Sequence, residues 1–284
     1  MKFSRRAFLK AALGVLAGSC GAVLAGYGGY QYGLRIETKL LDIERVRLPI
    51  KGLKSALEGL KIVQMSDIHL HPFTQIDFVR QAVEMTNQLK PDLVALTGDY
   101  VLQSADSIFE LAPVLASLNP KYGIFAAIGN HDIWTDVTTV QTGLEESGLT
   151  VLVNEGVLLD IGGEPFYMAG VDDAWSGRPD LKAALENLPA GVPTILLAHE
   201  PDLADDYSLD GRVSLQLSGH THGGQVRLPG YGALVLPPFG RKYALGLYRV
   251  NDTWVYTNRG LGVIGPPVRI NCRPEITEIT LIRG

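Results

Sequence analysis

Five apolar runs of strand length in this sequence each end at a cluster of polar residues. The runs lie at residues 62–65, 93–96, 124–128, 194–198 and 215–217, and the clusters that follow them contain DIH, GD, GNHD, H and GHTH. Between the first three runs, apolar residues recur with helical spacing at 78–89 and 108–118. Because ligands bind beyond the carboxyl ends of strands in open α/β sheets, this alternation predicts an α/β fold with one composite site.

The second half of the chain has more strand-like than helix-like segments. A hairpin is predicted where the apolar runs 151–153 and 157–161 flank the turn-like sequence Asn154-Glu155-Gly156. We expect further strands at 166–171, 254–257 and 276–282, and a short helix at 181–188. Hydrophobic residues make up 46% of the sequence and charged residues 19%, which indicates a globular protein with a sizeable core.

The polar clusters hold five of the six histidines, together with carboxylate and amide side chains. The candidate metal ligands are Asp67, His69, Asp99, Asn130, His199, His220 and His222. Seven such groups are too many for one tetrahedral zinc ion, and they fit two divalent ions bridged by a carboxylate. Imidazole combined with carboxylate favours Mn, Fe or Zn. The D-x-H and H-x-H spacings would direct both ligands of a pair to one side if the segments are extended, and the glycines around them would let the backbone approach the ions.

The ordered set D-x-H, G-D, G-N-H-D, H and G-H-x-H resembles the motifs of the calcineurin-like metallophosphoesterases. All five motifs are complete between Asp67 and His222. The resemblance implies a four-layer α/β/β/α sandwich, with two mixed β-sheets flanked by helices, over residues 40–284. It also implies that one ion is held by Asp67, His69 and His222, that the other is held by Asn130, His199 and His220, and that Asp99 bridges them. A hydroxide between the two ions would then attack phosphorus in line.

His131 and Asp132 complete the GNHD motif, and the resemblance implies that His131 lies beside the metals without binding them. We expect His131 to act catalytically, by protonating the leaving oxygen or by stabilising the charged equatorial oxygens. Asp132 either orients and charges His131 through a hydrogen bond or caps the helix that follows. Both interpretations of Asp132 stay open at this point.

The loop at 228–243 directly follows the GHTH cluster and contains several aromatic residues. Its position predicts that it lies near the metals. The aromatic residues and Arg241 are therefore candidates to bind an apolar or aromatic substrate that carries a phosphate. The alternative is a proline-stiffened loop without contact to the substrate.

The first 25 residues have the features of an export signal. MKFSRRAFLK carries four basic residues and no acidic one, and an apolar run of 15 residues follows at 11–25. The part SRRAFLK resembles the twin-arginine signal, so we expect the twin-arginine export machinery to be a partner. The segment could instead be retained as an N-terminal anchor, although 15 residues are short for a spanning helix, or be lipidated at Cys20. Residues 26–39, rich in glycine and tyrosine, are expected to be a linker to the domain.

These features predict a dinuclear-metal-dependent phosphoesterase in the periplasm or at the outer face of the cytoplasmic membrane. The chain resembles a single-domain, exported bacterial subfamily of phosphodiesterases, some of which hydrolyse lipid-linked nucleotide pyrophosphates. Phosphodiester or pyrophosphate substrates, lipid-linked or nucleotide-linked ones included, are therefore preferred, and a membrane nearby is compatible with them. The alternatives are a phosphomonoesterase and a non-catalytic exported metal-binding protein. A net charge of −5 without a basic groove predicts no binding to nucleic acid.

Overall fold

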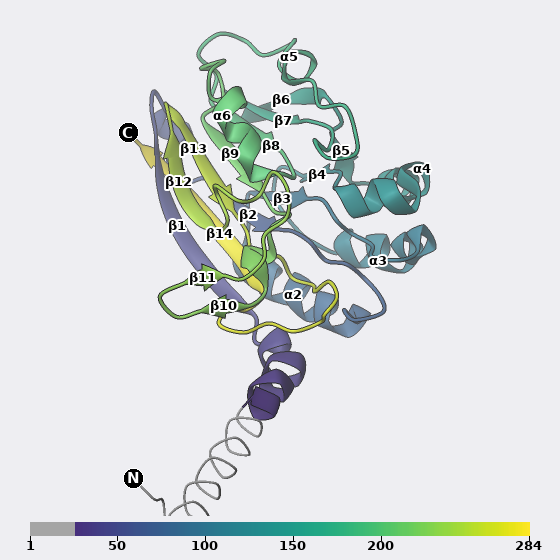
Figure 1. Ribbon diagram of the computed structural model, residues 1–284. Coiled ribbons are helices and arrows are strands. Elements are labelled where there is room, and N and C mark those ends of the chain that lie inside the picture. The colour runs from purple at the N-terminus through teal and green to yellow at the C-terminus, as the bar shows by residue number, and fades with distance from the viewer. Residues whose placement is uncertain (1–25) are drawn as a thin grey trace, which may run out of the picture.

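Two six-stranded mixed β-sheets form the centre of the protein (Figure 1). The computed structural model describes residues 26–284, so the predicted signal or anchor at 1–25, with Cys20, lies outside the described residues. In spatial order the first sheet contains β1 (Asp42–Ile50), β14 (Glu275–Arg283), β2 (Lys61–Met65), β3 (Leu93–Thr97), β4 (Ile124–Ala127) and β5 (Thr150–Val151). Strands β2 to β5 run parallel, and β14 is antiparallel to β2. The carboxyl ends of β2, β3 and β4 therefore lie at the same edge.

The second sheet repeats this arrangement with its own parallel centre. In spatial order it contains β12 (Gly246–Val250), β13 (Thr253–Thr257), β9 (Leu215–Ser218), β8 (Thr194–Leu197), β7 (Glu164–Gly170) and β6 (Glu155–Ile161). Strands β13, β9, β8 and β7 are parallel, and β12 and β6 pair antiparallel at the two edges. A separate hairpin is formed by β10 (Arg227–Leu228) and β11 (Gly232–Ala233).

Apolar side chains on both faces of the first sheet place it between two cores. In β3, Leu93 and Ala95 pack between the two sheets, whereas Val94 and Leu96 face the helices on the other side. This alternation follows from the two-residue period of a strand, and it explains why β3 is apolar at almost every position.

The helices form the outer layers. The first sheet is covered by α2 (Ile76–Gln88), α3 (Ile108–Leu115) and α4 (Asn130–Glu146), and the second by the single turns α5 (Leu181–Ala184) and α6 (Ala204–Tyr207). Short 3₁₀ turns lie at Glu37–Lys39, Ser55–Leu57, Ala105–Ser107, Pro201–Leu203 and His222–Gly224. The layers are therefore helices, sheet, sheet and helices, which confirms the predicted α/β/β/α sandwich.

The predicted hairpin across Asn154-Glu155-Gly156 is wrong. Strand β5 pairs with β4 in the first sheet, whereas β6 pairs with β7 in the second, so the chain crosses between the sheets at Asn154. Asn154 has a φ of 57° there, and its Oδ1 accepts hydrogen bonds from the N–H groups of Asp172 and Asp180. The hairpin instead turns at Gly162-Gly163, between β6 and β7. A turn-like sequence predicts a change of direction, but it does not reveal which strands pair.

The segment predicted as a linker is helical over residues 26–35 and packs against the domain. A Cβ at Gly33 would lie 2.7 Å from Val268 Cγ1, so glycine permits this close approach. The buried Glu37 accepts a hydrogen bond of 2.6 Å from the N–H of Cys272. Across residues 26–284, no helix combines the length and the apolar composition needed to cross a bilayer.

Candidate metal centre

The carboxyl ends of five strands, drawn from both sheets, meet at one place. Every predicted ligand follows one of these strands: Asp67 and His69 follow β2, Asp99 follows β3, Asn130 follows β4, His199 follows β8, and His220 and His222 follow β9. The two sheets are joined beside the site, because Gln64 Nε2 of β2 donates to the carbonyl oxygen of Ser218 in β9 at 2.9 Å. All seven side chains are buried, at 5% exposure or less.

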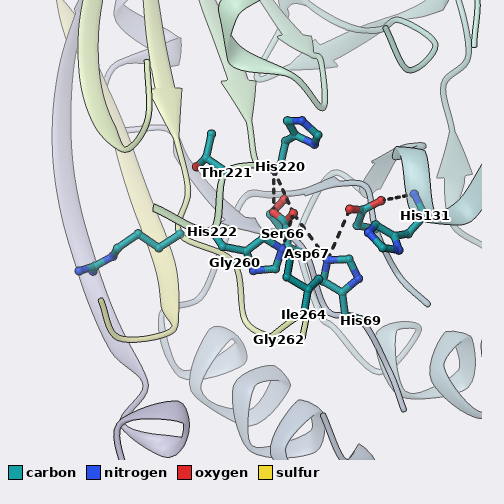
Figure 2. A network of polar contacts seen from close by, with 12 residues as sticks. Ser66, Asp67, His69, His131, His220, Thr221, His222, Gly260, Gly262 and Ile264 are labelled. Carbon is teal, nitrogen blue, oxygen red and sulfur yellow. Dashed lines mark hydrogen bonds and ion pairs between the residues drawn. The ribbon is translucent and has the colours of Figure 1, made fainter. Parts of the chain in front are cut away.

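One group of ligand atoms is formed by Asp67, His69 and His222 (Figure 2). The Nε2 atoms of His69 and His222 lie 3.0 Å apart. Asp67 Oδ1 lies 3.4 Å from His222 Nε2 and 4.0 Å from His69 Nε2. Three donor atoms therefore surround one point, with a mixture of imidazole and carboxylate that suits Mn, Fe or Zn.

A second group contains Asp99, His199 and His220. Asp99 Oδ2 lies 3.2 Å from His199 Nε2 and 3.4 Å from His69 Nε2, so this one oxygen contacts a histidine of each group. Asn130 lines the same cavity as Asp99 and His220, and its Oδ1 is buried without a hydrogen bond. Asp99 therefore has the position that a bridging carboxylate needs.

The imidazoles of the second group are held by backbone carbonyls on their outer side. His199 Nδ1 donates to Thr97 O at 2.6 Å, and His220 Nε2 donates to Pro238 O at 2.9 Å. The other nitrogen of each ring then faces the centre, which is how metal-binding histidines are usually oriented. His199 Nε2 is left buried without a hydrogen bond, 3.2 Å from the Asp99 carboxylate. A positive charge is favoured between this nitrogen and the Asp99 carboxylate, and either a proton or a metal ion supplies it, so these residues fit a metal ion.

Burial sets the charge state of the ligands. It lowers the pKa of both His69 and His220 to about 3, so both rings are neutral and able to bind metal at physiological pH. Burial would raise the pKa of Asp99 and lower that of His199, but the attraction between these two groups holds the pKa of Asp99 well below its usual range and raises that of His199 well above it. The pKa of Asp67 is raised to about 7, chiefly by burial.

Five of the seven predicted ligands have left-handed backbone conformations. Their φ angles are 48° for Asp67, 47° for His69, 59° for Asp99, 69° for His220 and 51° for His222. Such a conformation costs a residue other than glycine about 1–3 kcal/mol. The expectation that D-x-H and H-x-H segments are extended is therefore wrong, since sharp left-handed bends direct these side chains inward.

The glycines of the motifs make room for carboxylates. A Cβ at Gly219 would overlap Asp67 Oδ2, and one at Gly129 would overlap Asp99 Oδ1. In the space that glycine leaves, the N–H of His220 donates to both oxygens of Asp67, at 2.9 and 3.0 Å. The glycines therefore bring the backbone close to the ligand side chains, whereas the prediction was that the backbone would approach the ions.

Asp132 is fully buried and accepts hydrogen bonds from backbone only. Its Oδ2 accepts from the N–H groups of Gly129, at 3.0 Å, and Asp99, at 2.8 Å, and its Oδ1 accepts from Tyr100 N–H at 2.8 Å. It therefore caps the start of α4 and holds the loop that carries Asp99. Both oxygens are engaged by backbone N–H groups, and no hydrogen bond joins either to the His131 ring, which favours the capping interpretation; a role of Asp132 in catalysis stays a prediction. In this geometry Asp132 positions the Asp99 loop.

His131 lies at the start of α4, half-buried at the edge of the site. Its N–H donates to Asp99 Oδ1 at 2.8 Å, and its ring packs edge-on against His69 with a centroid distance of 4.7 Å. Its ring nitrogen also comes within ligand distance of His69 and Asp99, so geometry alone does not separate a ligand from a proton donor. The role of His131 as a non-ligand stays a prediction.

A cavity of about 480 Å³ lies above the ligands. Its floor contains Asp99, Asn130, His131, His220 and His222, and its walls are mostly apolar, from Trp134, Trp175, Val226, Leu234, Val235, Pro237, Ile264 and Pro266. The loop at 228–243 thus contributes to the site, as predicted from its position. Arg241 does not line the cavity: it is exposed, and its N–H donates to Asp202 Oδ2 at 2.8 Å, so the predicted contact with substrate has no support in this arrangement.

The sequence did not lead us to predict that two tryptophans, Trp134 and Trp175, line the cavity wall. Trp134 lies three residues after His131 on the same helix, a spacing that places both side chains on one face. Trp175 belongs to a loop whose N–H groups, at Ala174 and Trp175, donate to the Glu200 carboxylate at 2.9 and 3.1 Å. The signal for Trp175 was therefore Glu200, an acidic residue directly after the ligand His199.

Comparison with known proteins identifies the family of the chain. The sequence profile of the calcineurin-like phosphoesterases matches residues 60–224. The chain belongs to this family, and it is a metallophosphoesterase.

Relatives with similar sequences span nearly the whole chain. An uncharacterized metallophosphoesterase of Bacillus subtilis, YkuE, is 38% identical over 99% of this chain and 98% of its own length. The phosphodiesterase YaeI of Escherichia coli is 33% identical over 98% of this chain and 99% of its own length. A zebrafish (Danio rerio) transmembrane protein with a metallophosphoesterase domain is 36% identical, over 94% of this chain and 62% of the zebrafish protein.

Proposed function

We propose that the protein is a two-metal phosphodiesterase of the bacterial cell envelope that hydrolyses phosphodiester or pyrophosphate bonds. The observation that supports it best is the position of Asp99, whose Oδ2 contacts both His69 and His199. Asp67, His69 and His222 would hold one ion, Asn130, His199 and His220 the other, and Asp99 both. Two divalent ions held there would lower the pKa of a water molecule and offset the negative charge of a phosphoryl group.

Two residues beside the ligands have the remaining roles, which are to position the metal centre and to donate a proton or a hydrogen bond to the substrate. Asp132 keeps the Asp99 loop and the start of α4 in register through four backbone hydrogen bonds. His131 lies at the cavity floor beside Asp99, where it can donate a proton to the leaving oxygen or a hydrogen bond to an equatorial oxygen.

The shape of the cavity supports a diester over a monoester. A phosphate group alone would leave most of the 480 Å³ empty, and the walls offer mainly tryptophan, aliphatic and proline side chains. A second ester group of apolar or aromatic character would fill this space and bury apolar surface. The relative named as a phosphodiesterase points the same way.

The location in the cell envelope is supported by the first 25 residues. Their twin-arginine motif and apolar run are the features of an exported protein. Export in the folded state suits this centre, because ligands that come from five separate segments assemble only after folding, so metal could be bound before transport.

The test compares substrates and metals with purified protein. With added Mn, bis(p-nitrophenyl) phosphate is expected to be hydrolysed faster than p-nitrophenyl phosphate, and Asp99→Ala is expected to lose metal and activity together. Metal binding without turnover of either compound would indicate a non-catalytic metal-binding protein. Preferred turnover of the monoester would indicate a phosphomonoesterase.

A further inference from the structure

Two uncharged segments border the mouth of the cavity. Residues 228–240 read LPGYGALVLPPFG and residues 263–268 read VIGPPV, without a charged side chain in either. We call these two segments the apolar rim. Leu234, Val235, Ile264 and Pro266 of the apolar rim line the cavity. Tyr231, in the β10–β11 turn, and Val235, just after β11, are 75% and 76% exposed, and with the half-exposed Leu234 between them they form a contiguous apolar patch.

The apolar rim is continuous with the helix at 26–35. Next to it, the N–H of Arg227 in β10 donates to Ile270 O at 2.9 Å, and the N–H of Arg269 donates to Gly33 O at 3.1 Å. Hairpin, loop and helix therefore lie side by side, and Figure 1 shows the helix leaving the domain at the same end as β10 and β11.

The sequence before this helix indicates what covers the apolar rim. The 15-residue apolar run at 11–25 directly precedes the helix. The helix itself exposes Tyr27 and Tyr30, with Arg35 near its end. Tyrosine and arginine beside an apolar segment are typical of the membrane–water interface, where aromatic rings and basic groups meet the lipid headgroups.

We propose that the apolar rim rests on a lipid bilayer, with Tyr231 and Val235 inserted among the lipids and the mouth of the cavity facing the membrane. A bilayer fits better than a protein partner because the apolar rim offers no charge to pair and the adjoining helix leads to an apolar run. The inference rests on the proposed function only for the benefit that docking would bring. The apolar part of a phosphodiester carried by the membrane would enter the cavity from the lipid side. The docking itself requires no hydrolysis.

The test places a polarity-sensitive fluorophore on one cysteine in the full chain carrying Cys20→Ser; Cys272 is buried. Val235→Cys reports on the apolar rim. Leu209→Cys is the matched control, since Leu209 is also 76% exposed. It lies at the other end of the second sheet, where the neighbouring Ser208 accepts a hydrogen bond from Asn251 in the β12–β13 turn. Both proteins are mixed with vesicles of phosphatidylethanolamine and phosphatidylglycerol, with and without brominated acyl chains.

The label at 235 is expected to shift to shorter wavelength on vesicles and to be quenched by the brominated lipid, whereas the label at 209 does neither. Tyr231→Glu, outside the cavity lining, is expected to reduce the shift at 235 and leave hydrolysis of bis(p-nitrophenyl) phosphate unchanged. Equal, water-like emission at both positions would overturn the proposal. So would a shift at 235 that needs no vesicles and grows with protein concentration, since a second copy of the chain would then cover the apolar rim. The fluorescence signal does not depend on turnover. A protein that inserts into vesicles but hydrolyses no substrate would therefore contradict the proposed hydrolysis and leave the membrane docking supported.

Discussion

The replacement Asp132→Asn tests whether this carboxylate positions the metal centre or acts through His131. The asparagine is isosteric, and its oxygen can still accept from Tyr100 N–H. Its NH₂ group, however, would face the N–H groups of Gly129 and Asp99, which now bond to Oδ2. Two buried donors would lose their acceptor, at about 1–3 kcal/mol each, so we expect the free energy of unfolding to fall by about 2–6 kcal/mol.

The same change should loosen the loop that carries Asp99. Losing a residue that supports a metal ligand typically weakens metal binding about 10–100-fold. With saturating metal, kcat should stay near the parent value. Urea unfolding of the metal-free protein, metal titration and steady-state kinetics measure the three quantities.

Asp136→Asn is the matched control, because Asp136 lies at the kink of α4 and its exposed carboxylate caps the following turn by accepting from the N–H groups of Thr138 and Thr139. Asparagine serves as well as aspartate in such a position, so stability and metal affinity should not change. The reasoning is refuted if Asp132→Asn binds metal and unfolds like the parent while kcat falls and its pH profile shifts. That result would place the action of Asp132 on His131.

Three further predictions follow from the site and the sequence. His131→Ala is expected to reduce kcat about 10²–10⁴-fold with metal content intact by elemental analysis; loss of metal would make His131 a ligand. Burial raises the pKa of Asp67 to about 7, so below pH 7 a metal ion must displace a proton from this carboxyl group. The metal affinity measured by calorimetry should therefore fall at least about tenfold for each unit of decreasing pH. An affinity that does not change with pH would contradict this. Replacing Arg5 and Arg6 by lysine should retain the protein in the cytoplasm on cell fractionation, and undiminished export would exclude the twin-arginine route.

The parts of the fold that the sequence predicts are those decided by local pattern. Buried parallel strands such as β3 are short apolar runs, and the buried positions of α2 recur at Val79, Ala82, Val83 and Thr86, one helical face. Pairing across the sheets has no local signal. For this reason the turn at Asn154 looked like a hairpin, and the glycines at 26–33 looked like a linker although Gly33 packs against Val268.

In the site, too, the features with a local sequence pattern could be predicted and those that depend on long-range packing could not. The ligands could be found because their residue types are rare and recur at strand ends. The role of Asp132 could not be settled, because a capping carboxylate and one that orients a histidine occupy the same position in the motif. Trp134 and Trp175 were not predicted because they act through the shape of the cavity, which depends on two loops and a helix that meet only in the folded protein.

The ligands come from both sheets: Asp67, His69, Asp99 and Asn130 follow strands of the first, and His199, His220 and His222 follow strands of the second. Each proposed ion would therefore be a cross-link between the two halves of the sandwich, made from side chains up to 155 positions apart in the chain, from Asp67 to His222. Removing the metals with a chelator would remove these cross-links. It would therefore weaken the contact between the two sheets more than the pairing of strands within either sheet. Neither half of the chain alone could retain the metals, so metal content would serve as a measure of complete assembly.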